Sequence, residues 1–166
     1  MYQLKSISKA GIPDALQKAE RYRLLNQPRM AESICLDILE VEPDNHGAVV
    51  TMLLAITDQF GRNDTAARAT KARQLLPLIG NEYEQHYFSG IISERQGSAI
   101  LNAGKTLSYQ TAYQWLAEAM QHYEKAEAIR PSGNDDAILR WNTCARRIMS
   151  HQLQPRQELY EEPMLE

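Results

Sequence analysis

Three prolines, Pro43, Pro77 and Pro131, each close a similar stretch of this chain, in which a small residue and an apolar ladder precede the proline. The first two prolines are 34 residues apart, and the third follows after 54 residues, which is the same period with about 20 residues inserted. A fixed period of this size is typical of stacked helical hairpins, in which each hairpin packs only on its neighbours. The period therefore predicts an elongated all-α repeat protein.

The net charge of the chain bears on which kinds of partner it can bind. The chain has 166 residues, which is enough for three to four such repeats, and a net charge of −3. Binding to nucleic acid or to an anionic membrane surface needs a basic face, so neither is expected. Another protein is the expected partner.

The cysteines and histidines offer no pattern of a chemical site. Cys35 and Cys144 are far apart in helix-like segments, which disfavours a disulfide framework or a structural zinc site, and the four histidines are scattered. We therefore expect no metal, no cofactor and no catalytic residues. The first residues lack the apolar run of a signal peptide, so a cytoplasmic location with reduced thiols is expected.

Helix-period patterning predicts two regular helix pairs. The first pair is expected at about 14–25 and 28–42, with Pro28 opening its second helix. The second pair is expected at about 48–60 and from Asn63 or Asp64, as N-cap, to Pro77; Asp44 or Asn45 is expected to cap its first helix. The helix at 48–60 is apolar on most faces, which indicates that neighbours cover both of its sides.

The third pair is stretched. One helix is expected to start near Asn81 and its partner to end near Pro131, and the intervening segment 97–111 is expected to lengthen both helices, with the turn near 104–108. About eight extra residues per arm would project this hairpin about 12 Å beyond the others. The predicted organisation is one domain over 1–151, with repeats at 12–45, 46–80 and 81–133, a capping helix at 134–151, and a flexible acidic tail at 152–166.

The spacing of small and apolar residues before each proline resembles the tetratricopeptide repeat (TPR) family. Twelve residues before the prolines lie Ala31, Thr65 and Ala119, and five residues before them lie Ile38, Ala72 and Ala126. Small residues at such positions let two helices approach closely. The best match is the window 28–45, and the resemblance covers roughly residues 12–149. Departures include Ala15 and Val49, where the family has an early tryptophan.

The resemblance implies an α-α superhelix of right-handed twist, whose concave groove is lined by the first helix of each pair and takes a peptide or a helix of another protein. The partner-binding positions that it implies here are Leu16, Glu20, Arg23, Val50, Leu54, Asp58, Tyr87, Phe88, Ile91 and Arg95. One subset of the family clamps a carboxylate with basic residues, but the matching positions in this chain hold Leu16, Glu20, Glu84 and Phe88. Binding in that manner is therefore disfavoured.

Three alternatives remain open at the level of sequence. Gly104-Lys105-Thr106 resembles the end of a phosphate-binding loop but lacks the leading glycine and a preceding strand, so nucleotide binding is a remote alternative. Several arginines near the C-terminus either form a solvated face or meet an acidic partner, including the chain's own Glu158, Glu161 and Glu162. Self-association into a homo-oligomer is the third. The function predicted first is a non-enzymatic adaptor or scaffold that binds a partner segment in the groove.

Overall fold

The described part of the chain is entirely helical apart from its connections. The computed structural model describes residues 1–104 and 109–155, and within these residues it contains seven α-helices and no strand. Their bounds are α1 Ile12–Leu24, α2 Pro28–Val41, α3 His46–Thr57, α4 Thr65–Leu75, α5 Glu82–Asn102, α6 Tyr109–Ala128 and α7 Asp136–Ser150. Short 3₁₀ turns at Lys9–Gly11 and Leu76–Leu78 precede α1 and follow α4. The all-α prediction is confirmed.

Side-chain caps fix where two of the longer connections end. The Asn45 side chain accepts a hydrogen bond from the Ala48 N–H at 2.9 Å, and Asn81 accepts one from the Glu84 N–H at 3.1 Å, so each satisfies a donor of a first helical turn. The expected cap at Asp64 is wrong. Asp64 lies in the left-handed region at φ 54° and makes no capping bond; the Thr65 hydroxyl instead accepts from the Gly61 N–H at 2.9 Å.

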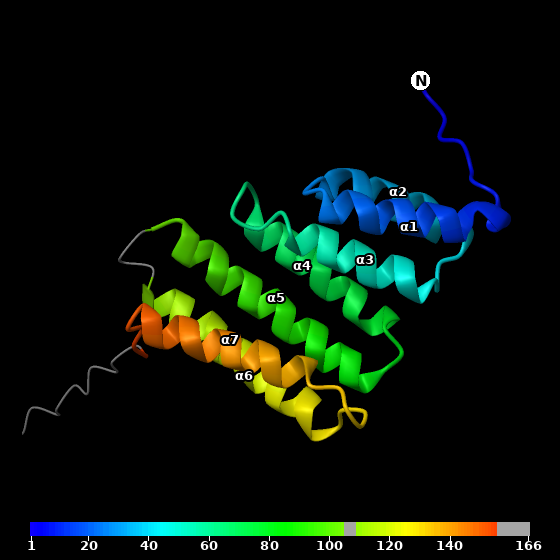
Figure 1. The fold of residues 1–166 in the computed structure, drawn as a ribbon. Helices are drawn as coiled ribbons and strands as arrows, with labels where there is room; N and C mark the ends of the chain where they lie inside the picture. The colour runs from blue at the N-terminus through cyan, green and yellow to red at the C-terminus, as the bar shows by residue number, and fades with distance from the viewer. Residues whose placement is uncertain (105–108, 156–166) are drawn as a thin grey trace, which may run out of the picture.

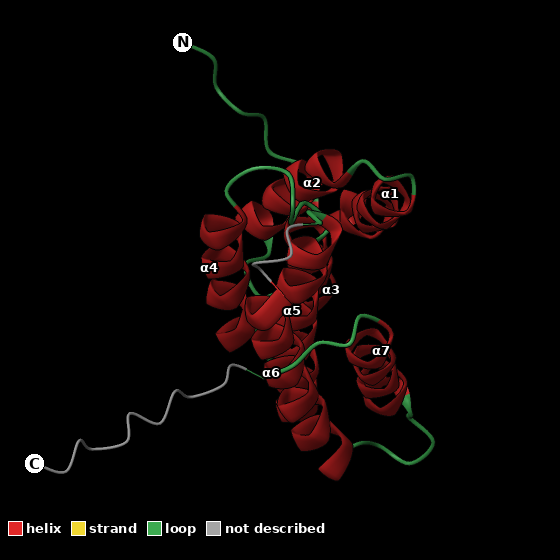
Figure 2. Ribbon diagram, turned by 90° about the vertical axis from the view of Figure 1, so that its left-hand side faces the viewer, coloured by secondary structure: helices red, strands yellow, loops and turns green. Residues whose placement is uncertain are grey.

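The helices form two layers. Each helix packs against the next one along the chain, and α1 also contacts α3. In the view of Figure 1, α1, α3, α5 and α7 lie in front of α2, α4 and α6, and the rotated view of Figure 2 places α1 and α3 on the side opposite α4. All helices that open a hairpin therefore share one side of the molecule.

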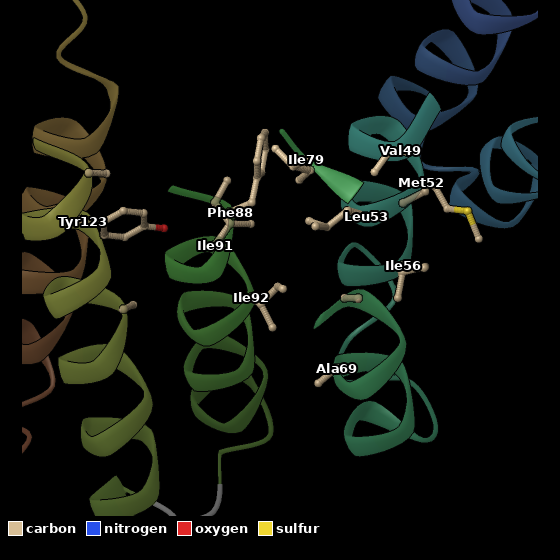
Figure 3. Packing of buried hydrophobic residues seen from close by; sticks show 14 of the residues in the cluster. Val49, Met52, Leu53, Ile56, Ala69, Ile79, Phe88, Ile91, Ile92 and Tyr123 are labelled. Atoms are coloured by element: carbon tan, nitrogen blue, oxygen red, sulfur yellow. The ribbon is translucent and has the colours of Figure 1, made fainter. Parts of the chain in front are cut away.

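The core follows the seam between the layers. Figure 3 shows its centre, where Leu53 and Ile56 of α3 face Ile92 of α5 and the Tyr123 ring of α6 lies on the other side of α5. Most residues of helix α3 are buried: Ala48, Val49, Thr51, Met52, Leu53, Ala55, Ile56 and Thr57. This confirms the prediction that neighbours cover this helix on both sides. Burial of this kind supplies most of the stabilisation of a helical protein.

The third hairpin is longer than the others, as predicted. Helices α5 and α6 have 21 and 20 residues, whereas α1 to α4 have 11 to 14. Two glycines allow the long pair to pack closely: a Cβ at Gly90 would lie 2.4 Å from the Tyr123 ring, and one at Gly97 would lie 3.0 Å from Leu116. Gly104, at φ 69°, ends the first arm, and the rest of the predicted turn, 105–108, lies outside the described residues.

Helix α7 covers the end of the long hairpin. It begins at Asp136, whose N–H is bonded by the Asn134 side chain at 3.0 Å, and it buries Ala137 and Cys144 against α5 and α6. Leu153, just beyond the helix, is also buried, and its N–H donates to the Ile148 carbonyl at 3.0 Å. The predicted acidic tail from 156 onward lies outside the described residues.

Candidate protein-interaction face

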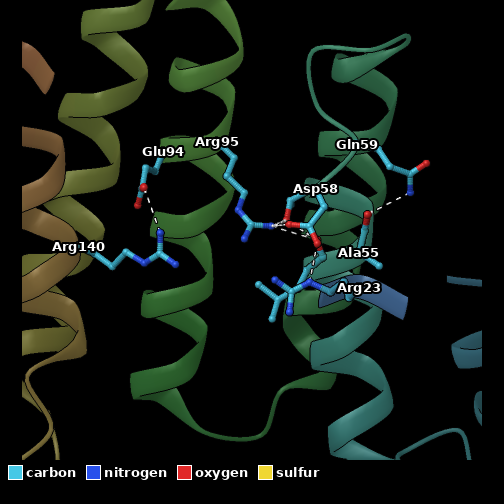
Figure 4. Close-up of polar contacts among 9 residues, drawn as sticks. Arg23, Ala55, Asp58, Gln59, Glu94, Arg95 and Arg140 are labelled. Atoms are coloured by element: carbon cyan, nitrogen blue, oxygen red, sulfur yellow. Dashed lines mark hydrogen bonds and ion pairs between the residues drawn. The ribbon is translucent and has the colours of Figure 1, made fainter. Parts of the chain in front are cut away.

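A chain of ion pairs crosses the layer formed by α1, α3, α5 and α7. Its members are Arg23 of α1, Asp58 after α3, Glu94 and Arg95 of α5, and Arg140 of α7 (Figure 4). We call the surface that carries these five residues the odd-helix face. Each pair joins two consecutive helices of this layer, so the network follows the long axis of the molecule.

Asp58 is the centre of the first half of the network. Its Oδ2 accepts from Arg23 Nε at 2.5 Å, and its Oδ1 accepts from Arg95 Nη1 at 2.6 Å. About a fifth of each of these three side chains is exposed to solvent, so they are screened less than surface pairs. One carboxylate therefore connects α1, α3 and α5.

Arg95 also caps the C-terminal end of α3. Its Nη1 donates to the Leu54 carbonyl at 3.0 Å and to the Thr57 hydroxyl at 2.5 Å. A cation near the last carbonyls of a helix interacts favourably with the helix dipole. Arg95 adds a further donor to the Leu54 carbonyl, which already accepts from the Asp58 N–H at 2.9 Å and from the Thr57 hydroxyl at 3.0 Å. This explains why an arginine from α5 is held at this point of α3.

Glu94 is the centre of the second half. It is almost fully buried, its Oε2 accepts from the Tyr123 hydroxyl at 2.6 Å, and its Oε1 accepts from Arg140 Nη1 at 3.2 Å. Burial raises the pKa of Tyr123, and the neighbouring carboxylate raises it further. Burial alone would lower the pKa of Arg140, but Glu94 and Tyr87 outweigh burial and raise it. Arg140 is therefore held as a cation beside Glu94 at neutral pH.

The odd-helix face carries an excess of positive charge around Arg95. Burial lowers the pKa of Arg95, and although Asp58 acts in the opposite direction, Arg23 and Arg140 lower the pKa further. A fourth arginine, Arg147 of α7, donates to the Ser98 hydroxyl of α5. Arginines from α1, α5 and α7 thus place their positive charges on the same face.

The structure brings together only some of the sequence-predicted partner-binding residues. Arg23, Asp58 and Arg95 meet in the network, and Glu20 is exposed on α1. Four more predicted positions are half-buried and contribute apolar surface: Leu16, Val50, Leu54 and Tyr87.

Two predicted residues belong to the core instead. Phe88 and Ile91 keep 7% and 2% of their surface exposed, because both belong to the main core cluster, in which the Phe88 side chain extends toward Ile79 (Figure 3). The Phe88 ring packs edge-on to Tyr87, with ring centres 5.3 Å apart. These two side chains lie beneath the odd-helix face and are not accessible to a partner.

Sequence reasoning missed Glu94 and Tyr123 as members of the network. Glu94 lies three residues after Ile91 and seven after Tyr87, so it falls on an apolar stripe of α5, and a charged residue on such a stripe is a signal of a paired, buried charge. Arg140 is one of the arginines near the C-terminus, for which the sequence predicts either a solvated face or an acidic partner. Its pairing with α5 depends on how α7 is placed, which the sequence does not specify.

A second polar cluster lies away from the odd-helix face. Glu32 of α2 accepts from Lys71 at 2.5 Å and from Gln59 at 3.0 Å, and Arg68 lies 3.9 Å away. Burial alone would raise the pKa of Glu32, but the hydrogen bonds from Lys71 and Gln59 and the two positive charges outweigh it and lower the pKa. This cluster fastens α2 to α3 and α4.

Two grooves are open on other surfaces. One, of about 350 Å³, lies between α6 and α7 and is lined mostly by apolar side chains such as Met120, Ile148 and Met149. The other, of about 450 Å³, lies beside the long hairpin and includes Gln96 and Trp115, over which Arg73 stacks at 5.4 Å. Among residues 1–104 and 109–155, no group of three or more metal-binding side chains is gathered, and no helix combines the length and apolar character that crossing a bilayer requires.

The observed geometry is therefore an elongated helical layer with a charged and partly apolar face. Cys35 and Cys144 are buried, and burial raises the pKa of each thiol to about 12, so neither thiol is activated. Comparison of the chain with family models, with curated proteins and with solved structures gave no significant match.

Proposed function

We propose that this protein is a non-enzymatic adaptor of the TPR type, which binds a segment of another protein along the odd-helix face. The observation that carries the proposal is that ion pairs link neighbouring helices along the whole of one layer, from Arg23 of α1 to Arg140 of α7. Repeat proteins with a layered helix arrangement use such extended surfaces to bind partners. The periodicity of the three prolines supports the same class.

The chemistry of the face suits a peptide or a helix. Half-buried Val50, Leu54 and Tyr87 supply apolar area, while Arg23 and Arg95 supply hydrogen-bond donors. Interfaces combine an apolar centre with surrounding polar groups, and tyrosine and arginine are enriched in them. Right-handed superhelical twist and a concave groove belong to this proposal as well.

The test is a matched pair of variants. Leu54→Glu with Tyr87→Lys places charge on the odd-helix face, whereas Leu36→Glu places charge on an exposed site of α2, in the other layer. Each protein is used as bait in extracts of the source cell, after circular dichroism has shown that it remains helical. Capture of a specific partner should be lost with the first variant and retained with the second. Undiminished capture by a folded face variant would exclude this face as the binding site.

A second candidate function, self-association, is favoured by the groove between α6 and α7. Met149 and Leu139 of α7 are mostly exposed, and Met149 lines the groove together with mostly apolar side chains. Exposed apolar patches of this kind mark interaction sites. Sedimentation over a range of concentrations tests this function: a monomer at every concentration, unchanged in Met149→Glu, would exclude it.

A further inference from the structure

The odd-helix face has more cationic groups than carboxylates to pair with them. Four arginines and two carboxylates lie along it: Arg23, Arg95, Arg140 and Arg147, with Asp58 and Glu94. Two further acidic side chains of α1 and α5 bear on this count. Glu84 already contacts His46 at 2.6 Å, and Glu20 is exposed on α1 without forming an ion pair with a described residue. Neither of them pairs with Arg140 or Arg147, which among the described residues have only the Glu94 carboxylate between them.

The carboxylates of this face have no remaining free oxygen. Both oxygens of Asp58 accept from arginine, and those of Glu94 accept from Tyr123 and Arg140. A guanidinium group carries five N–H donors on three nitrogens. The bonds of Arg23, Arg95 and Arg147 named above each use one nitrogen, and Arg140 contacts both Glu94 and the Tyr87 side chain, so each of the four keeps unused donors. The face therefore offers donors in a geometry that suits further carboxylates.

We propose that the acidic segment 156–166 of this same chain docks on the odd-helix face, with its glutamates on Arg140 and Arg147. The segment contains Glu158, Glu161 and Glu162 within five residues, against the single cation Arg156. Charge complementarity and attachment to the same helix make it a matching occupant. The proposal does not rest on the proposed function, because it needs no outside partner.

The point of attachment gives the segment enough reach. Leu153 is buried and bonded to the Ile148 carbonyl, so the chain leaves α7 one to two turns beyond Arg147. Arg140 lies about 10 Å further back along α7, at 1.5 Å per residue. The nine residues 154–162, when extended, span up to about 30 Å from Leu153. The glutamates can therefore reach both arginines and the neighbouring α5.

The side of α7 on which Arg147 lies favours the odd-helix face over the apolar groove as the docking surface for the acidic segment. Arg147 donates to Ser98 of α5, so it lies on the side of α7 that meets the odd-helix face. Ile148 and Met149, in contrast, line the groove toward α6. The three glutamates match the first side, and docking of Leu159 and Tyr160 in the groove is the rival outcome that the experiment must separate.

Paramagnetic broadening in the full-length chain tests the proposal. A nitroxide is attached at Met164→Cys, because Cys35 and Cys144 are buried and unreactive. Amide signals of α5 and α7 near Ser98 and Arg140 should broaden. The broadening should weaken when ionic strength rises from about 0.1 M to about 1 M, because the Debye length falls from about 10 Å to about 3 Å.

Matched substitutions give the decisive comparison. Replacing Glu158, Glu161 and Glu162 with glutamine should reduce the broadening, since each exposed ion pair changes a docking equilibrium by about 1.4- to 5-fold. Arg147→Gln should reduce it as well, whereas Arg146→Gln, at the exposed neighbouring position, should not.

Four results would overturn the proposal: no broadening of described residues, broadening confined to the α6/α7 groove, broadening that survives the glutamine substitutions, or broadening seen only between labelled and unlabelled chains in a mixed sample. Loss of partner capture with intact broadening would instead count against the proposed function alone.

Discussion

Gly90 is the position where one added methyl group should have the largest effect on this fold. It lies in the interior of α5, and an alanine Cβ there would come within 2.4, 2.7 and 2.8 Å of three carbons of the Tyr123 ring. The ring is fully buried, and its hydroxyl is bonded to Glu94 at 2.6 Å. Tyr123 therefore cannot move aside without losing packing or this hydrogen bond.

The expected magnitude is the balance of two effects. Alanine is favoured over glycine in a helix interior by about 1 kcal/mol. Overpacking a well-packed core costs about 1–3 kcal/mol, and the severe overlap at Gly90 lies at the upper end of that range. Weakening the buried Tyr123–Glu94 bond adds about 1 kcal/mol more. Gly90→Ala should therefore lower the free energy of unfolding by about 2–3 kcal/mol, which corresponds to a fall in Tm of about 4–12 °C.

Urea unfolding followed by far-ultraviolet circular dichroism measures this change as a lower midpoint at an unchanged m-value. Gly80→Ala is the matched control: an added Cβ there meets nothing within 4 Å, so it should leave stability unchanged or raise it by up to about 1 kcal/mol. In a Tyr123→Leu background the penalty of Gly90→Ala should shrink, because the clashing ring is gone. A Gly90→Ala protein as stable as the wild type would refute the close packing of α5 on α6.

Three further predictions concern titration and reactivity. Burial lowers the pKa of His122 below 6.5 despite the opposing charge of Glu118. The wild type should therefore lose stability relative to His122→Gln as pH falls below about 6.5, and the two proteins should show the same pH dependence of stability above that value. Unfolding free energies that change in parallel with pH over the whole range would contradict this. The pKa of Glu32 is lowered, so its contribution should be present at neutral pH and be lost as pH falls through and below about 4.5, and urea midpoints of Glu32→Gln and wild type should converge there. Cys35 and Cys144, with pKa values of about 12, should resist a thiol reagent at pH 8 in the folded protein and react as two thiols in denaturant; rapid labelling of the folded chain would show that the cores around them open readily.

The helices of this protein were predictable because their signals are local. Period, capping residues and prolines predicted the seven helices, mostly to within two or three residues, and the long apolar run of α3 predicted its position between neighbours. The lengthening of the third hairpin followed from counting residues between prolines. Each of these properties depends on residues close together in the chain.

The candidate face was predictable only in part, because its contacts join distant helices. Glu94 and Arg95 are adjacent in sequence, yet successive residues of a helix point about 100° apart, so one pairs toward α7 and the other toward α3. Which neighbour each meets depends on tertiary placement. Phe88, expected on the partner surface, is buried for the same reason: a helical pattern does not show which distant residues pack over a position.

The sharing of Asp58 between two arginines has a mechanical consequence for an elongated molecule. Because every helix contacts only its near neighbours, bending is resisted at each junction separately. Asp58 links the α1/α3 junction to the α3/α5 junction through one carboxylate, so opening either junction weakens the anchor of the other. Helices α1 to α5 should therefore move as one rigid unit. Removing the charge of Asp58 should make both junctions more flexible at once.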